Sequence, residues 1–65
     1  MTTSERIGRE VQEAREAKGW TIYRLSQESG LQETHLRRIE EGRYNLRVDV
    51  AERAAKALGI TLKIG

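Results

Sequence analysis

The sequence predicts an all-α fold, a bundle of four short helices followed by a short C-terminal β-strand. In four stretches, apolar residues recur three and four positions apart, which is the spacing of one helix face. A glycine follows each stretch, where helices commonly end, at Gly19, Gly30, Gly42 and Gly59. The last six residues alternate between apolar and polar side chains, which is the period of a strand. With 65 residues in all, we expect a single domain over residues 1–65.

The first helix is expected over about residues 5–18, after a threonine or serine cap at positions 2–4. Its inner face has the spacing i, i+4, i+7 and consists of Ile7, Val11 and Ala14. Gly19 ends this helix. Trp20, the only tryptophan, is predicted to pack in the core or against the start of the next helix rather than to contact a ligand.

The stretch from residue 21 to residue 42 predicts two short helices joined by a tight turn. Thr21 can cap the first of them, over residues 22–29, with its hydroxyl. Gly30 follows this helix, where a positive φ costs glycine nothing. Leu36 and Ile39 then give the second helix an apolar edge, with position 32 as its cap. Each helix has a possible hydrophobic staple, formed by Trp20 with Leu25 and by Leu31 with Leu36.

A fourth helix is expected over about residues 47–58, and its small inner residues allow another helix to approach closely: Val48, Ala51, Ala54, Ala55 and Leu58. The tail that follows reads as a strand over about residues 60–64, with Ile60, Leu62 and Ile64 on one face. The sequence predicts no second strand, and a lone strand leaves its backbone groups unpaired. We therefore expect the tail to pair with its own copy in a homodimer. The alternatives are a frayed tail on a monomer and a tail that pairs with a different protein.

Composition narrows the function classes. The chain has no cysteine and a single histidine, His35, so we expect no disulfide, no metal site and no cofactor. No nucleophile–base pair or carboxylate pair is apparent, so we do not expect an enzyme. Neither a membrane-span length of apolar residues nor a signal peptide is visible, which predicts a soluble, cytoplasmic protein without a membrane partner. The net charge of +2 is too small to indicate nucleic-acid binding by itself.

The motif in residues 21–42 resembles the helix-turn-helix of the Cro/repressor family, often called the XRE family. The resemblance extends over about residues 7–59 and rests on Thr21, Leu25, Ser26, Gly30, Leu31, Leu36, Ile39, Glu40 and Gly42. It implies a lambda-repressor-like bundle and a sequence-specific DNA-binding transcriptional regulator, a repressor that binds a palindromic operator in double-stranded DNA as a homodimer. The alternative is a protein-interaction module, such as an antitoxin that binds a toxin partner, with DNA binding secondary. The short chain leaves little room for a separate toxin-binding segment, which favours the repressor.

The resemblance also implies roles for individual residues. It places base contacts on the third helix, where the exposed early positions are Gln32, Glu33, Thr34, Arg37 and Arg38. It places DNA backbone contacts on Thr21, Arg24, Arg43, Tyr44 and Asn45. It also implies an ion pair between Arg15 on the first helix and Glu40 on the third. The chain departs from the family where a glutamine commonly opens the second helix, because Ile22 stands there and cannot make that phosphate contact.

Overall fold

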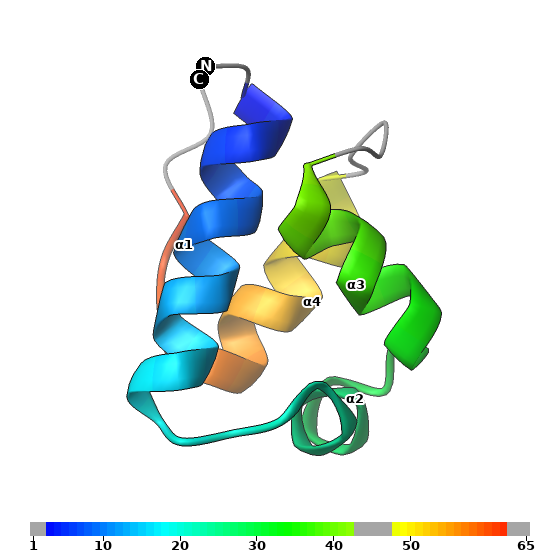
Figure 1. Cartoon of the computed structure of the whole chain (residues 1–65). Helices are drawn as coiled ribbons and strands as arrows, with labels where there is room; N and C mark the ends of the chain where they lie inside the picture. The colour runs from blue at the N-terminus through cyan, green and yellow to red at the C-terminus, as the bar shows by residue number, and fades with distance from the viewer. Residues whose placement is uncertain (1–2, 43–47, 63–65) are drawn as a thin grey trace.

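The computed structural model describes residues 3–42 and 48–62, which contain four helices (Figure 1). These are α1 (Thr3–Ala17), α2 (Ile22–Ser29), α3 (Glu33–Glu41) and α4 (Val48–Leu58). Helix α1 packs against α3 and α4, and α2 packs against the same two helices from the other end of the bundle. The predicted all-α bundle of four helices is confirmed, and α2 has the predicted bounds. Helix α1 begins two residues earlier than predicted, and α4 begins one residue later.

All four helices contribute to one apolar core. Its buried members are Ile7, Val11, Leu25, Leu31, Leu36, Ile39, Ala51, Ala54 and Leu58. Trp20 is only half-buried and packs against this core from its edge. No polar or charged residue is fully buried in the part of the chain that the structure describes. The fold is therefore stabilised mainly by apolar burial.

Helix α1 approaches α3 closely at Gly8. A Cβ atom built on Gly8 would lie 2.2 Å from the carbonyl oxygen of Ile39 and 3.1 Å from that of Glu40. The absence of a side chain therefore lets the two backbones come into contact. No pattern in the sequence singles out Gly8, since a glycine inside a helix is ordinarily only a destabilising residue.

The predicted C-terminal strand is not supported. Residues 60–62 follow α4 without forming a strand, and Ile64 lies outside the described residues. The backbone N–H of Ile60 instead donates to the carbonyl of Ala55 at 3.0 Å, which closes the end of α4. Ile60 and Leu62 are half-buried and pack against the core of their own chain. A strand needs a neighbouring strand to pair with, and the described residues of one chain provide none.

Candidate nucleic-acid interface

Helix α2 begins and ends at side-chain and backbone features that the sequence predicted. The Thr21 hydroxyl accepts a hydrogen bond from the backbone N–H of Arg24 at 3.1 Å, which caps the first turn. Gly30 has a φ of 75°, and its N–H donates to the carbonyl of Ser26 at 2.9 Å. Any other residue at this left-handed position would be strained. The chain therefore turns sharply after α2 and enters α3 with a fixed direction.

Two serines hold the turn between α2 and α3. The Ser26 hydroxyl donates to the carbonyl of Leu31 at 2.5 Å. The Ser29 hydroxyl donates to the carbonyl of Leu25 at 2.7 Å and accepts from the N–H of Leu31 at 3.2 Å. Both backbone polar groups of the buried Leu31 are thereby satisfied. From the sequence, Ser26 was named only as a residue of the motif, and Ser29 was given no role.

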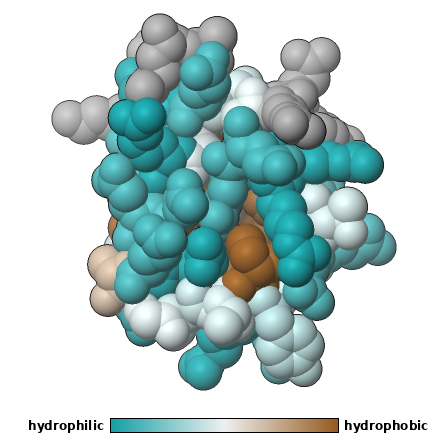
Figure 2. All heavy atoms as spheres, viewed as in Figure 1, coloured by the Kyte–Doolittle hydropathy of each residue, from teal (hydrophilic) through white to brown (hydrophobic). Residues whose placement is uncertain are grey.

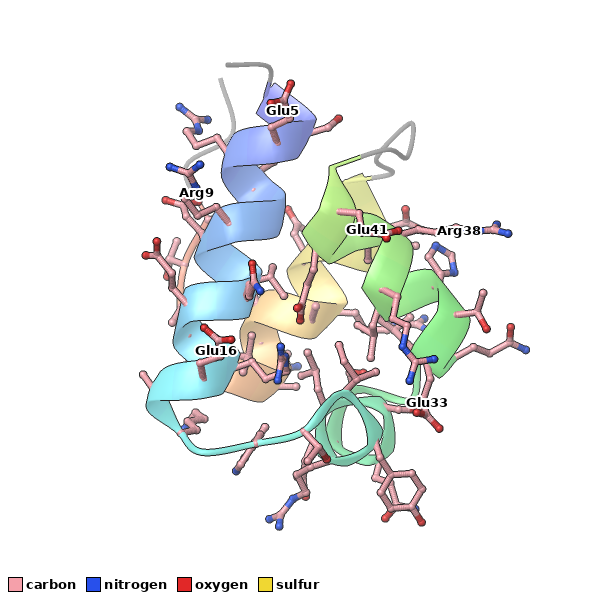
Figure 3. The ribbon with its side chains drawn as sticks, in the orientation of Figure 1. Glu5, Arg9, Glu16, Glu33, Arg38 and Glu41 are labelled. Atoms are coloured by element: carbon pink, nitrogen blue, oxygen red, sulfur yellow. The ribbon has the colours of Figure 1, made fainter. Side chains whose placement is uncertain are left out.

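Helix α3 buries Leu36 and Ile39 in the core and directs the Glu40 side chain towards Arg15 on α1. Gln32, Thr34, Arg37 and Arg38 are exposed, and Glu33 retains 39% of its side-chain exposure. Arg38 extends away from the bundle (Figure 3) and makes no hydrogen bond or ion pair with any described residue. The five predicted base-contacting residues therefore lie together on the outward side of α3 and its cap. The surface over α3 is mostly hydrophilic (Figure 2).

Two ion pairs reduce the charge of this surface. Arg37 Nη2 lies 3.5 Å from Glu33 Oε1 on α3, and Arg24 Nε lies 3.0 Å from Glu28 Oε2 on α2. Both pairs link residues four positions apart, and all four side chains are well exposed. Exposed pairs of this kind contribute only about 0.3–0.5 kcal/mol to stability. Their main effect is therefore electrostatic, since each neutralises an arginine that would otherwise attract phosphate.

The ion pair between Arg15 and Glu40 connects α1 to α3. Arg15 Nε donates to Glu40 Oε2 at 2.8 Å, and Nη2 donates to Oε1 at 3.0 Å. The third guanidinium nitrogen, Nη1, donates to the carbonyl of Trp20 at 2.7 Å. The side chains are only 13% and 8% exposed. The hydrogen bond to Glu40 is the largest of the effects that raise the pKa of Arg15 above its ordinary value, although burial opposes it.

The predicted residues at the start of α2 lie on the surface. Thr21 and Arg24 are exposed, and the Arg24 guanidinium also lies 5.1 Å from the centre of the Trp20 ring. Tyr23 stands beside them and is 59% exposed, but it was not among the predicted site residues. The Tyr23 hydroxyl accepts from Gln27 Nε2 at 2.6 Å, so its own proton remains available for donation. Tyr23 directly precedes Arg24 at the start of α2, and this position could have identified it as a surface residue of the site.

Three of the predicted backbone contacts, Arg43, Tyr44 and Asn45, lie outside the described residues. Within residues 3–42 and 48–62, no three histidine, cysteine, aspartate or glutamate side chains are grouped so as to hold a metal ion. None of the helices described here combines the length and the apolar character that crossing a membrane requires.

Comparison with known proteins agrees with this geometry. A family model described as "Helix-turn-helix" matches residues 11–64, which is most of the chain and includes α2, the turn and α3. Searches of the curated proteins and of the solved structures gave no significant match. The fold agrees with this match, since two short helices are joined at a left-handed glycine and the second has an outward polar face. The chain belongs to the Cro/C1-type helix-turn-helix, or XRE, family of DNA-binding regulators.

Proposed function

We propose that this protein is a transcriptional repressor that binds a palindromic operator as a homodimer, with α3 of each subunit in the major groove. The observation that carries the proposal is the outward face of α3, where Arg38 stands without a partner among the described residues. An α-helix fits the major groove, where arginine can bond guanine O6 and N7 bidentately. Repression requires no further surface, since a protein bound over a promoter excludes polymerase by occupancy.

The start of α2 supplies the contacts to the DNA backbone in this proposal. Thr21, Tyr23 and Arg24 are exposed at the N-terminal end of α2, where the helix dipole favours an anion. Arg24 would exchange its carboxylate partner Glu28 for a phosphate oxygen. Arg43, Tyr44 and Asn45 complete the proposed backbone contacts. Contacts of this kind position α3 without selecting a sequence.

A homodimer would supply the second half of the operator contact. A single helix-turn-helix reads few base pairs, whereas a twofold dimer reads two half-sites roughly 34–36 Å apart. We place the dimer contact at the tail, with Ile60, Leu62 and Ile64. Ile60 and Leu62 are half-buried, so part of their apolar surface remains exposed for a second copy. This dimer contact requires only the packing of apolar side chains and does not require a strand.

The proposed function is tested with fluorescence anisotropy on DNA from upstream of the protein's own gene, together with light scattering on the purified chain. The proposal predicts saturable binding that survives an excess of random competitor DNA, a dimeric mass, and weaker binding when one half-site is scrambled. Binding that random DNA abolishes would refute sequence-specific recognition. A monomeric mass, with stable capture of a different protein at the tail, would favour the interaction module instead.

A further inference from the structure

We propose that Glu33 and Arg37 act as one unit and together read a single C·G base pair, with Glu33 on the cytosine and Arg37 on the guanine. This inference rests on the proposed function, because it assigns a base preference to the same surface. Glu33 opens α3 and Arg37 follows it by four residues, so the two side chains lie on one side of the helix. Their charged atoms, Arg37 Nη2 and Glu33 Oε1, are already 3.5 Å apart.

The spacing of this ion pair resembles the spacing of two atoms in a base pair. In a C·G pair the cytosine N4 amino group donates to guanine O6, so these atoms lie about 2.9 Å apart in the major groove. Glu33 Oε1 can accept the second N4 proton while Arg37 Nη2 donates to O6. The two side-chain atoms and the two base atoms then form a closed ring of hydrogen bonds. Each charge would be satisfied by the DNA and by the other side chain at once.

Neighbouring groups on the bases favour C·G over A·T. An A·T pair also presents a donor, adenine N6, beside an acceptor, thymine O4. However, adenine places its N7 acceptor next to the Glu33 carboxylate, and thymine places a methyl group next to the Arg37 guanidinium. In C·G, the guanine N7 acceptor lies beside the guanidinium instead, and cytosine places no acceptor beside the carboxylate. We therefore expect the affinity order C·G, then A·T, with the reversed pairs G·C and T·A weakest.

The carboxylate is the reason for expecting a strict preference. Glu33 brings a negative charge into a groove bordered by phosphates, and only a donor on a base offsets that cost. The reversed pairs G·C and T·A place an acceptor where Glu33 needs a donor, so they should be rejected by about tenfold or more relative to C·G. Glu28 provides a matched control, because it forms the same kind of exposed ion pair on α2 and is not assigned to any base.

The test is in vitro selection from random DNA, followed by anisotropy with the selected site and its three substituted versions at the assigned position. We expect an invariant C·G position in each half-site. Glu33→Gln and Arg37→Ala should both relax that one position, and Glu33→Gln should raise the rank of A·T because glutamine bonds adenine bidentately. Glu28→Gln should strengthen binding to all four sites alike, and Arg38→Ala should relax a different position.

Three results would overturn the inference. Glu33→Gln could leave the base preferences unchanged, or Glu33→Gln and Arg37→Ala could relax two different positions. In either case the proposed function would stand and only the paired reading would fail. If the wild-type chain enriched no sequence at all, both the inference and the proposed function would fail. Thermal melts of each variant exclude unfolding as the cause of a lost preference.

Discussion

Gly8→Ala should destabilise the protein, although a glycine-to-alanine change inside a helix ordinarily stabilises it. The new Cβ would lie 2.2 Å from the Ile39 carbonyl oxygen, and real contacts of this kind are not shorter than 3.0 Å. Helices α1 and α3 must therefore separate locally by 0.8 Å or more. Overpacking of this kind costs about 3 kcal/mol at its upper range. The better helix propensity of alanine returns about 1 kcal/mol, which leaves a net loss of about 2 kcal/mol.

The measurement is thermal unfolding followed by circular dichroism, with Trp20 fluorescence as a second probe. For a domain of this size, a loss of about 2 kcal/mol lowers Tm by about 10 °C. The matched control is the exposed Gln12 on the same helix, where Gln12→Ala should be about 1 kcal/mol more stable than Gln12→Gly. If Gly8→Ala were as stable as the wild type, the close contact between α1 and α3 would be refuted.

The other predictions concern stability, capping and assembly. Glu40→Gln should destabilise by about 3 kcal/mol, measured by urea unfolding, because it strands a guanidinium that is mostly buried; an unchanged midpoint would mean that the pair contributes nothing. The pKa of Arg15 is raised in the fold, so the stability linked to its positive charge is fully present below the pKa of an unfolded arginine and is lost only in strong alkali. Loss of this charge should therefore not lower Tm between pH 7 and pH 10. Thr21→Ala should lower the free energy of unfolding by about 1 kcal/mol, whereas Thr21→Ser keeps the capping hydroxyl and should lose little. Equal losses in the two variants would argue against the cap. Leu62→Asp should convert the proposed dimer into a monomer by light scattering, and a dimeric mass would exclude the tail from the interface.

The turn and the core were predictable because their signals are local. Thr21 lies directly before a run of apolar helical spacing, and a threonine there caps a helix by a bond to a backbone N–H three residues later. Gly30 was predictable since few other residues tolerate its φ of 75°. Leu36 and Ile39 follow helical periodicity, and both are buried. Such features depend on residues within one turn of each other.

Features that depend on tertiary contacts or on the path of the backbone through a turn could not be read from spacing. The role of Gly8 depends on the backbone of Ile39, which is 31 residues away in sequence. The Ser29 hydroxyl could have pointed outward, and only the path of the turn brings it to the N–H of Leu31. The tail was misjudged for a related reason. An alternation of apolar and polar residues forms a strand only where a partner strand exists. Ile60 and Leu62 instead bury part of their apolar surface against the core of their own chain.

The pairing of charges on the candidate site was likewise only partly predictable. Sequence position placed Arg37 and Glu33 on one face of α3, but not in contact. The resemblance implied the pair of Arg15 and Glu40, and the described geometry adds the Trp20 carbonyl as a third acceptor. The net charge of α3 does not distinguish Arg37, which already has a carboxylate partner, from Arg38, which has none among the described residues.

The most direct test of the central claim compares Arg38→Ala with Arg9→Ala in binding to operator and to random DNA. Both changes remove one exposed arginine, but Arg38 projects from α3 and Arg9 lies on α1 on the other side of the molecule (Figure 3). If α3 reads bases, Arg38→Ala should weaken operator binding by about 1–3 kcal/mol and relax one operator position, while Arg9→Ala should weaken it far less. Equal, small losses from both variants on both DNAs would contradict recognition through α3.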